Sequence, residues 1–366
     1  MCYCEKNHMI IRILHQYHNN MYDTVKALEK IARVEFLSYR TSKLTPGITA
    51  QQSSVFGKKF KMYVPWHLWS MLSYDTNVLV LKHLNDPINF FPYLFAWVKG
   101  IRCVVIVQRP TALSFPGYIF LQSLLIKFLQ HIDARIMAVT KDGYTWAQSL
   151  HLKTSYIPTC IDPQRFKVSH LNTNPNQLHL LTVSKYQDRK HLPLLIQAVA
   201  ELQQRYPAIS FSLSIVGSLS QRKPSQDEYL HVQDEIKRSG LEKKILLKTN
   251  IPYSEMPTEY ANAHAFILPA EREPLGYAIV EAMAAGLPVF CSTDVGAVSY
   301  VQEGENGYVF APNSYQEIVR AIGHCITPEG ITNTQLLTQL GRRSTKIIDA
   351  QHSPEKLKSS FLNLLQ

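Results

Sequence analysis

Short apolar runs alternate with longer amphipathic runs along the second half of the chain, from about Thr154 onward. The short runs are rich in β-branched residues and predict strands at 155–158, 179–183, 209–216, 244–249, 265–269 and 288–291. The longer runs repeat apolar residues at helical spacing and predict helices at 193–206, 226–239, 255–263, 277–285 and 315–324. Strands that alternate with helices are typical of parallel α/β units, so we expect a doubly wound sheet here.

The first half of the chain shows the same pattern more weakly. Its apolar runs predict strands at 10–14, 34–37, 78–81, 103–107 and 135–139. A polar stretch between Phe166 and Leu178 is rich in turn-forming residues, which indicates a domain boundary. The length of 366 residues fits two domains, because domains commonly have roughly 100–200 residues.

Composition and charge narrow the class of protein. With 46% hydrophobic and 18% charged residues, the chain has enough apolar surface to bury two cores. The net charge of +10 attracts anions. A nucleic-acid ligand is not expected, because the sequence has no helix-turn-helix pattern and no metal-finger spacing. An anionic small molecule, an anionic membrane and a merely solvated basic surface stay open.

The cysteines and the apolar stretches favour a cytoplasmic location. Four scattered cysteines sit in apolar surroundings and read as reduced core residues: Cys103, Cys160, Cys291 and Cys325. Cys2 and Cys4 have no second pair that would complete a metal site. Residues 1–7 lack the apolar core of a signal peptide. The longest apolar stretch, 88–107, is interrupted by Lys99 and Arg102, so we expect a helix and then a strand rather than a membrane span.

The loop between the predicted strand 265–269 and the predicted helix at Tyr277 carries the main candidate chemistry. Such a helix N-terminus offers backbone N–H groups and partial positive charge to a phosphate or a sugar oxygen. Glu273 in the loop and Glu281 in the helix can face one cleft, where carboxylates accept hydrogen bonds from vicinal hydroxyls. By themselves, two Glu at this spacing also fit a helix-start residue and a solvated helix position. The small residues that follow Glu281 favour the cleft.

These residues carry a family resemblance. Glu273 and Glu281 stand in E-P-L-G-Y-A-I-V-E and resemble the E-x7-E motif of retaining GT-B glycosyltransferases, the clan of glycogen and sucrose synthases. The resemblance implies that Glu273 contacts the donor sugar and Glu281 the ribose. It also implies that backbone N–H groups of the loop hold the sugar and phosphate of the donor; these loop residues are Pro274, Leu275, Gly276 and Tyr277.

A basic segment, V-S-K-Y-Q-D-R-K-H at 183–191, is similar to the V-G-R-x4-K-G segment of the same family. Lys185 stands where Arg is usual, and Lys190 matches the family's Lys. By resemblance the pair neutralises the donor diphosphate, so we assign catalytic roles to Lys185, Lys190 and Glu273. Ser184 replaces a glycine of the motif. Gly217, in I-V-G, is expected either to let the chain turn beside the nucleotide base or to be an ordinary strand-end glycine.

The N-terminal half departs from the family pattern. No glycine-rich loop follows the first strand, and Gln108 stands where many relatives have a His at a strand end. Gln cannot act as an acid or base, but the family's mechanism relies on the donor phosphate as internal base. His83 is another strand-end residue that can face the acceptor, or it is structural.

The resemblance implies a GT-B α/β fold with two Rossmann-like, doubly wound parallel-sheet domains facing a cleft. We expect an N-terminal acceptor-side domain at 1–168, a nucleotide-sugar domain at 169–352, and a final helix at 353–366 that crosses back. The expected reaction is retaining transfer of a sugar from a nucleotide-diphosphate donor to a saccharide or lipid-linked acceptor in cell-envelope polysaccharide biosynthesis, without metal or cofactor. A catalytically silent nucleotide-sugar or glycan binder and a nucleotide-sugar epimerase are the alternatives.

Two apolar features are candidates for peripheral contact with the anionic inner face of a membrane. The stretch 118–132 is amphipathic with a wide apolar face, although ordinary core packing is the favoured explanation for it. A basic and aromatic cluster combines three lysines with two tryptophans: Lys58, Lys59, Lys61, Trp66 and Trp69.

Overall fold

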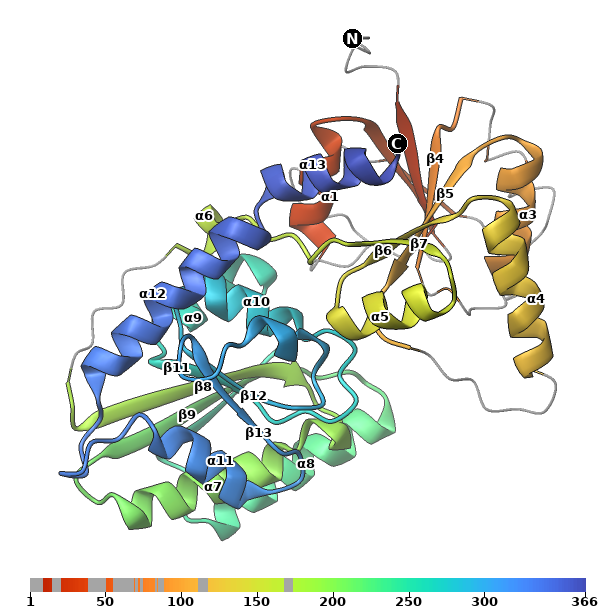
Figure 1. Cartoon of the computed structure of the whole chain (residues 1–366). Helices are drawn as coiled ribbons and strands as arrows, with labels where there is room; N and C mark the ends of the chain where they lie inside the picture. Colours follow the sequence, from red (N-terminus) through yellow and green to blue (C-terminus); the bar gives the residue numbers. More distant parts are fainter. Residues whose placement is uncertain are drawn as a thin grey trace. The chain divides into compact units, whose positions relative to one another are not determined.

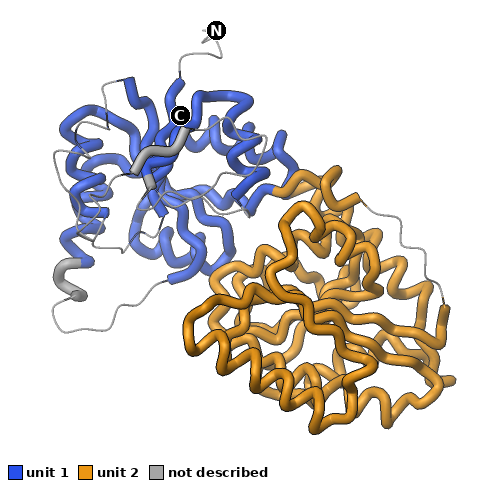
Figure 2. The backbone as a smooth tube through the Cα atoms, turned by 180° about the vertical axis from the view of Figure 1, so that it is seen from behind, with its two compact units in different colours: residues 1–160, 352–366 blue, residues 161–351 orange. Residues whose placement is uncertain are grey.

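The structure is a computed structural model that describes residues 9–14, 21–38, 51–54, 69, 72, 75–82, 84, 89–110, 118–167 and 174–366. The chain forms two compact units (Figure 2). The first unit contains residues 1–160 and 352–366, and the second contains residues 161–351. The domain limits at 168 and 352 stay predictions.

The first unit is built on a seven-stranded parallel sheet in the order β3-β2-β1-β4-β5-β6-β7. Its strands are β1 (Ile10–Leu14), β2 (Arg33–Ser38), β3 (Gln51–Ser54), β4 (Val78–Lys82), β5 (Arg102–Val107), β6 (Arg135–Ala138) and β7 (Lys153–Tyr156). Its helices are α1 (Tyr22–Glu29), α3 (Phe90–Val98), α4 (Tyr118–His131), α5 (Lys141–Ser149) and α13 (Pro354–Leu364). The order reverses between β1 and β4, which is the pattern of a doubly wound sheet.

One hydrophobic core joins this sheet to α3, α4 and α5. Tyr93 of α3, Leu129 of α4 and Ala147 of α5 are fully buried in it. Near the other end of the chain, α13 packs against α1 and belongs to the first unit (Figure 1). The strand predicted at 155–158 had been grouped with the second half, and this was wrong. It is β7, which pairs with β6 at the edge of the first sheet.

The second unit is built on a six-stranded parallel sheet in the order β10-β9-β8-β11-β12-β13. Its strands are β8 (Gln177–Lys185), β9 (Ser210–Ser218), β10 (Ile245–Thr249), β11 (Ala265–Leu268), β12 (Val289–Ser292) and β13 (Gly307–Phe310). Its helices and 3-10 turns are α6 (Pro163–Phe166), η3 (Asp188–Lys190), α7 (Leu192–Arg205), α8 (Lys223–Arg238), η4 (Tyr253–Glu255), α9 (Met256–Ala261), α10 (Tyr277–Ala284), η5 (Gly296–Tyr300), α11 (Tyr315–Gly323) and α12 (Thr334–Gln351).

The strands and helices predicted for this unit are confirmed within a few residues, whereas β13 and α12 were not predicted from the pattern. The core lies between the sheet and helices such as α7 and α11, where Leu195, Phe211 and Ile322 are fully buried. The four described cysteines, at 103, 160, 291 and 325, are buried thiols, as expected.

Candidate active site

Two neighbouring strands of the second unit bring the predicted basic and acidic residues together. Strands β8 and β11 pair in parallel, so their carboxyl ends lie at the same edge of the sheet. Lys185 is the last residue of β8, and Lys190 ends the short turn η3 that follows. The loop after β11 carries Glu273, whose Oε2 accepts from Lys190 Nζ at 2.5 Å and from an Arg189 guanidinium nitrogen at 2.8 Å.

The charges of this cluster are strongly coupled. Burial lowers the pKa of Lys190, and its ion pair with Glu273 opposes this shift. Burial also works against ionisation of Glu273, but Lys190 and Arg189 outweigh it and hold the pKa of Glu273 below its usual value. The nearby positive charge of Lys185 contributes to lowering the pKa of Lys190. The site therefore holds a partly buried carboxylate among cations at the carboxyl ends of the strands.

The loop from Glu273 to Gly276 is held by backbone hydrogen bonds to a neighbouring segment. Glu273 N donates to Asp294 O, Gly296 N donates to Glu273 O, and Ala297 N donates to Leu275 O. A Cβ on Gly296 would lie 2.1 Å from Pro274 O, so only glycine permits this close approach. The acidic residue of the cluster is therefore preorganised.

Gly276 sets the direction in which α10 leaves this loop. Its φ of +87° lies in the left-handed region, and a Cβ there would lie 2.8 Å from Val295. Helix α10 begins at the next residue, Tyr277. Its first N–H groups lie beside the loop that carries Glu273, which is the arrangement of an anion site.

Glu281 lies in α10, one turn from its start, and is 6% exposed. Its Oε1 accepts from Tyr253 Oη at 2.8 Å and its Oε2 accepts from Tyr260 Oη at 2.6 Å. Tyr260 is fully buried, and its ring packs edge-on against Phe166. Burial and the carboxylate of Glu281 raise the pKa of Tyr260, which keeps this hydroxyl a donor. Two tyrosines thus fix the orientation of the second acidic residue.

Gly217 has a packing reason that the sequence did not reveal. A Cβ at this position would lie 2.2 Å from the ring of Tyr186, which is fully buried. Gly217 pairs with Ser184 in the β8–β9 register. Gly217, Ser184 and Tyr186 therefore lie together at the strand ends beside Lys185. Gly217 therefore admits the Tyr186 ring under the basic segment.

The residues expected on the acceptor side belong to the first unit. Gln108 directly follows β5, is 8% exposed, and its carbonyl accepts a hydrogen bond from the Thr140 hydroxyl. His83 lies outside the described residues, and so do Trp66 and the three lysines of the basic cluster. The acceptor roles of Gln108 and His83 stay predictions.

Several residues of the cluster escaped sequence reasoning. Arg189 was passed over although it stands beside Lys190 in the basic segment. Asp294 accepts from the backbone N–H of Arg272 through its side chain and lies far from the loop in sequence. Neither tyrosine partner of Glu281 has a local signal, because hydrogen bonds across 21 and 28 positions depend on the tertiary fold.

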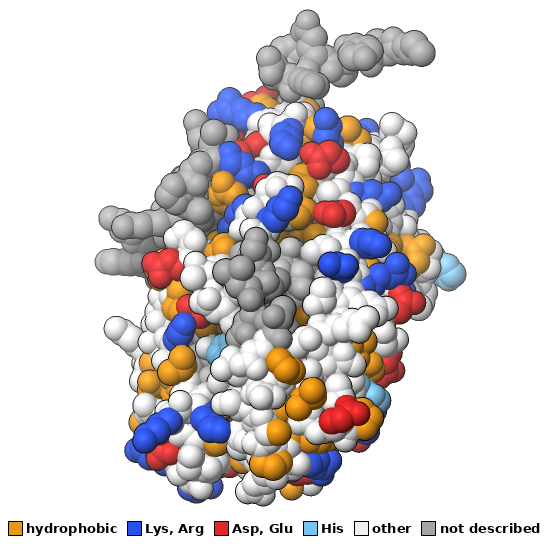
Figure 3. Space-filling model, turned by 90° about the vertical axis from the view of Figure 1, so that its left-hand side faces the viewer, with side chains coloured by type: hydrophobic (Ala, Val, Ile, Leu, Met, Phe, Trp, Pro, Cys, Tyr) orange, Lys and Arg blue, Asp and Glu red, His pale blue; other side chains and the backbone are white. Residues whose placement is uncertain are grey.

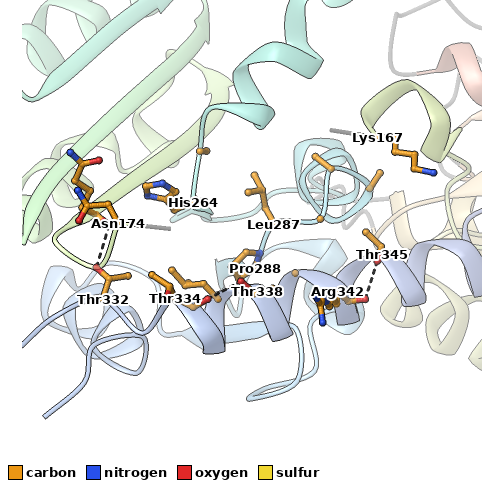
Figure 4. A pocket seen from close by; sticks show the side chains of 17 residues that line it. Lys167, Asn174, His264, Leu287, Pro288, Thr332, Thr334, Thr338, Arg342 and Thr345 are labelled. Carbon is orange, nitrogen blue, oxygen red and sulfur yellow. Dashed lines mark hydrogen bonds between the residues drawn. The ribbon is translucent and has the colours of Figure 1, made fainter. Parts of the chain in front are cut away.

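A separate cavity of about 370 Å³ lies at the opposite, amino-terminal edge of the second sheet. Figure 4 shows Thr334, Thr338 and Arg342 of α12 on one side, with His264, Leu287 and Pro288 on the other. His264 precedes β11 and Pro288 precedes β12. This cavity contains none of the predicted site residues.

Solved structures with similar architecture identify the fold. The glycosyltransferase from Rickettsia africae superposes with a TM-score of 0.79 at 15% identity, covering 100% of both chains. HepE of Anabaena in complex with UDP-glucose gives 0.76 at 17% identity, over 98% of this chain and 99% of that one. Sucrose-phosphate synthase from Thermosynechococcus elongatus gives 0.74 at 15% identity, over 98% of each. The expected GT-B fold is confirmed.

Sequence relatives point to the family. D-inositol 3-phosphate glycosyltransferase of Corynebacterium glutamicum is 34% identical over 34% of this chain and 29% of its own length. Putative colanic acid biosynthesis glycosyltransferase WcaL of Escherichia coli is 20% identical over 56% of this chain and 49% of its own length. The chain thus spans half or less of the length of these curated relatives. Residues 164–344, just under half of the chain, match the family described as Glycosyl transferases group 1.

Proposed function

We propose that the protein is a glycosyltransferase that moves a sugar from a nucleotide-diphosphate donor to a saccharide or lipid-linked acceptor, with retention of the anomeric configuration. One observation carries the proposal: Lys190 and Glu273, from two different loops, meet at 2.5 Å beside the start of α10. A buried ammonium and a helix N-terminus at the same place suit a diphosphate, and the carboxylate suits sugar hydroxyls.

The cations serve the leaving group. Transfer breaks the bond between the anomeric carbon and the diphosphate oxygen, forms a bond to the acceptor oxygen, and moves the acceptor's hydroxyl proton to the departing phosphate. The diphosphate gains negative charge in this step, and the ammonium groups of Lys190 and Lys185 stabilise it. A preorganised group of this kind contributes on the order of 3 kcal/mol to the transition state. Arg189 adds a third cation, so we propose that no metal ion is needed.

The carboxylates and the loop serve the rest of the donor. Glu273 accepts hydrogen bonds from the sugar hydroxyls once Lys190 turns to the diphosphate. Glu281, oriented by its two tyrosines, accepts from the ribose hydroxyls. The backbone of 274–277, with Ser184 and Gly217 at the neighbouring strand ends, lines the donor. HepE of Anabaena, a structural neighbour, has been crystallised with UDP-glucose, and a Mycolicibacterium smegmatis relative is described as GDP-mannose-dependent, so both bases belong in a donor screen.

A matched pair of variants tests the site. Lys190→Met removes a lysine paired with Glu273, and Lys248→Met removes one paired with Glu259 at 2.8 Å elsewhere in the second unit. After a thermal-shift screen of nucleotide sugars has found the donor, we expect Lys190→Met to lower kcat about 100-fold or more. Lys248→Met should keep kcat. Equal rates in wild type and Lys190→Met would remove the assignment of Lys190, and chelation of divalent metal should leave the wild-type rate unchanged.

The same assay separates the alternatives. A donor that binds but is neither hydrolysed nor transferred would identify a silent binder. This alternative is worth testing because Gln108 stands where many relatives have a His. A donor that isomerises without acceptor would identify an epimerase. Among the relatives, WcaL is described as a colanic acid biosynthesis protein, which supports a role in cell-envelope polysaccharide synthesis. We place that reaction in the cytoplasm, at the inner face of the membrane when the acceptor is lipid-linked.

A further inference from the structure

Large apolar side chains are exposed on two neighbouring helices of the first unit. Seven such side chains are exposed in the described part of the chain, and five of them lie on α3 and α4. These five form what we call the α3–α4 patch: Phe90, Phe91, Trp97, Val98 and Leu124. Each is between 42% and 57% exposed. Clustered exposure of this kind marks an interaction surface.

The patch is a single surface built from both helices. Phe128 of α4 contacts Phe90 and Trp97 of α3, with ring centroids 6.4 and 5.9 Å apart. Figure 1 shows the two helices side by side at the edge of the first unit. Helix α3, F-F-P-Y-L-F-A-W-V, is apolar all round and buries only Pro92, Tyr93 and Ala96. A helix that is apolar on every side requires an apolar environment on its outer face as well.

The two helices that form the patch carry charged side chains of one sign. No Asp or Glu occurs between Asp86 and Asp133. The exposed basic side chains in this interval include Arg102 at the start of β5 and Lys127 on α4, whereas Lys99 donates hydrogen bonds to Trp69 O and Leu72 O. On the face drawn in Figure 3, by contrast, Lys and Arg are interspersed with Asp and Glu. An apolar surface whose own helices carry basic and no acidic side chains complements an anionic partner.

We propose that the α3–α4 patch docks on the surface of an anionic lipid bilayer. Phenylalanine and tryptophan side chains enter the boundary between headgroups and acyl chains, and Lys127 and Arg102 attract anionic headgroups. None of the described helices is long and apolar enough to cross a membrane, so this contact is peripheral. Docking goes beyond the proposed transfer reaction and does not depend on it. The patch includes α4, which overlaps the amphipathic stretch 118–132 noted in the sequence, and adds α3, which the sequence did not suggest.

Co-sedimentation with vesicles tests the patch without any sugar donor. The full chain is mixed with vesicles of phosphatidylcholine and phosphatidylglycerol, and with vesicles of phosphatidylcholine alone. Phe91→Ser with Trp97→Ser should weaken binding to the mixed vesicles by roughly tenfold for each side chain removed. The matched control is Leu230→Ser with Leu246→Ser, two leucines of similar exposure in the second unit, which should bind as wild type does.

The charge is tested separately. Lys127→Gln should weaken binding to the anionic vesicles roughly fivefold, and added salt should reduce binding further. Circular dichroism of each variant shows whether the fold is kept. Wild-type protein that stays in the supernatant with anionic vesicles overturns the proposal, and so does a Phe91 and Trp97 variant that binds like the control. The sedimentation coefficients of wild type and the patch variant are also compared without lipid. A lower value for the variant assigns the surface to a second copy of the chain and refutes docking on lipid.

Discussion

The ion pair between Lys190 and Glu273 predicts a measurable coupling in stability. The two side chains are 7% and 15% exposed and 2.5 Å apart. Removing one partner of a buried pair costs about 3–5 kcal/mol when the other charge is left uncompensated. Arg189 remains 2.8 Å from the same carboxylate oxygen after Lys190→Met. We therefore expect Lys190→Met to lower the free energy of unfolding by about 1–3 kcal/mol.

A double-mutant cycle isolates this pair. Urea unfolding of wild type, Lys190→Met, Glu273→Gln and the double variant gives four free energies of unfolding, and the coupling between the two changes should be about 1–2 kcal/mol. The equivalent cycle at Lys248 and Glu259, whose side chains are 35% and 12% exposed, should give less, about 0.5 kcal/mol. If Lys190→Met lowers the free energy of unfolding by the same amount with Glu273 present or replaced by Gln, the ion pair does not contribute to stability.

The pH dependence of this cycle has a defined sign. The pKa of Glu273 is below its usual value of 4.5 in the folded state, so the unfolded chain binds more protons in the interval between the two values. Stability from Glu273 is therefore complete above pH 4.5 and is lost as the pH falls through the folded pKa. The difference in stability between wild type and Glu273→Gln should shrink when unfolding is measured at increasingly acidic pH. A difference that does not change with pH would contradict the ionised state of Glu273.

Two further predictions concern packing and buried titration. Gly217→Ala places a Cβ 2.2 Å from the Tyr186 ring, so it should lower the urea-unfolding free energy by about 1–3 kcal/mol; Gly323→Ala, whose nearest atom is 3.8 Å away, should be neutral or slightly stabilising. Burial lowers the pKa of His352, whose Nδ1 lies 2.8 Å from Thr159 O, to about 4. Because the unfolded chain binds the proton first, stability should fall by about 2 kcal/mol from pH ~7.5 to ~5, and His352→Asn should reduce that slope.

Much of the second unit was predictable from the order of residues alone. Its strands are short continuous apolar runs, which is typical of parallel strands buried on both faces. Its helices repeat apolar residues with a period of about 3.6, which depends only on local geometry. The loop from Glu273 to Tyr277 was also predictable, because Pro and Gly next to a helix start restrict or permit particular backbone conformations locally. The spacing of the two glutamates by itself indicated the resemblance to GT-B glycosyltransferases. The first unit was harder, since β3 itself, Q-Q-S-S, has no β-branched residue.

Only the tertiary structure decided how the candidate site is completed. The pairing of Glu281 with Tyr253 and Tyr260, and of Glu273 with Arg189, joins residues 21 to 84 positions apart. The role of Gly217 depends on where the Tyr186 ring lies, and the assignment of β7 depends on which sheet offers it a free edge. The exposed outer face of α3 also depends on the tertiary structure. Every residue of α3 is apolar, so only the packing shows which side chains are buried and which are exposed. Sequence periodicity fixes the faces of an element, but the burial of each face is set by its neighbours in space.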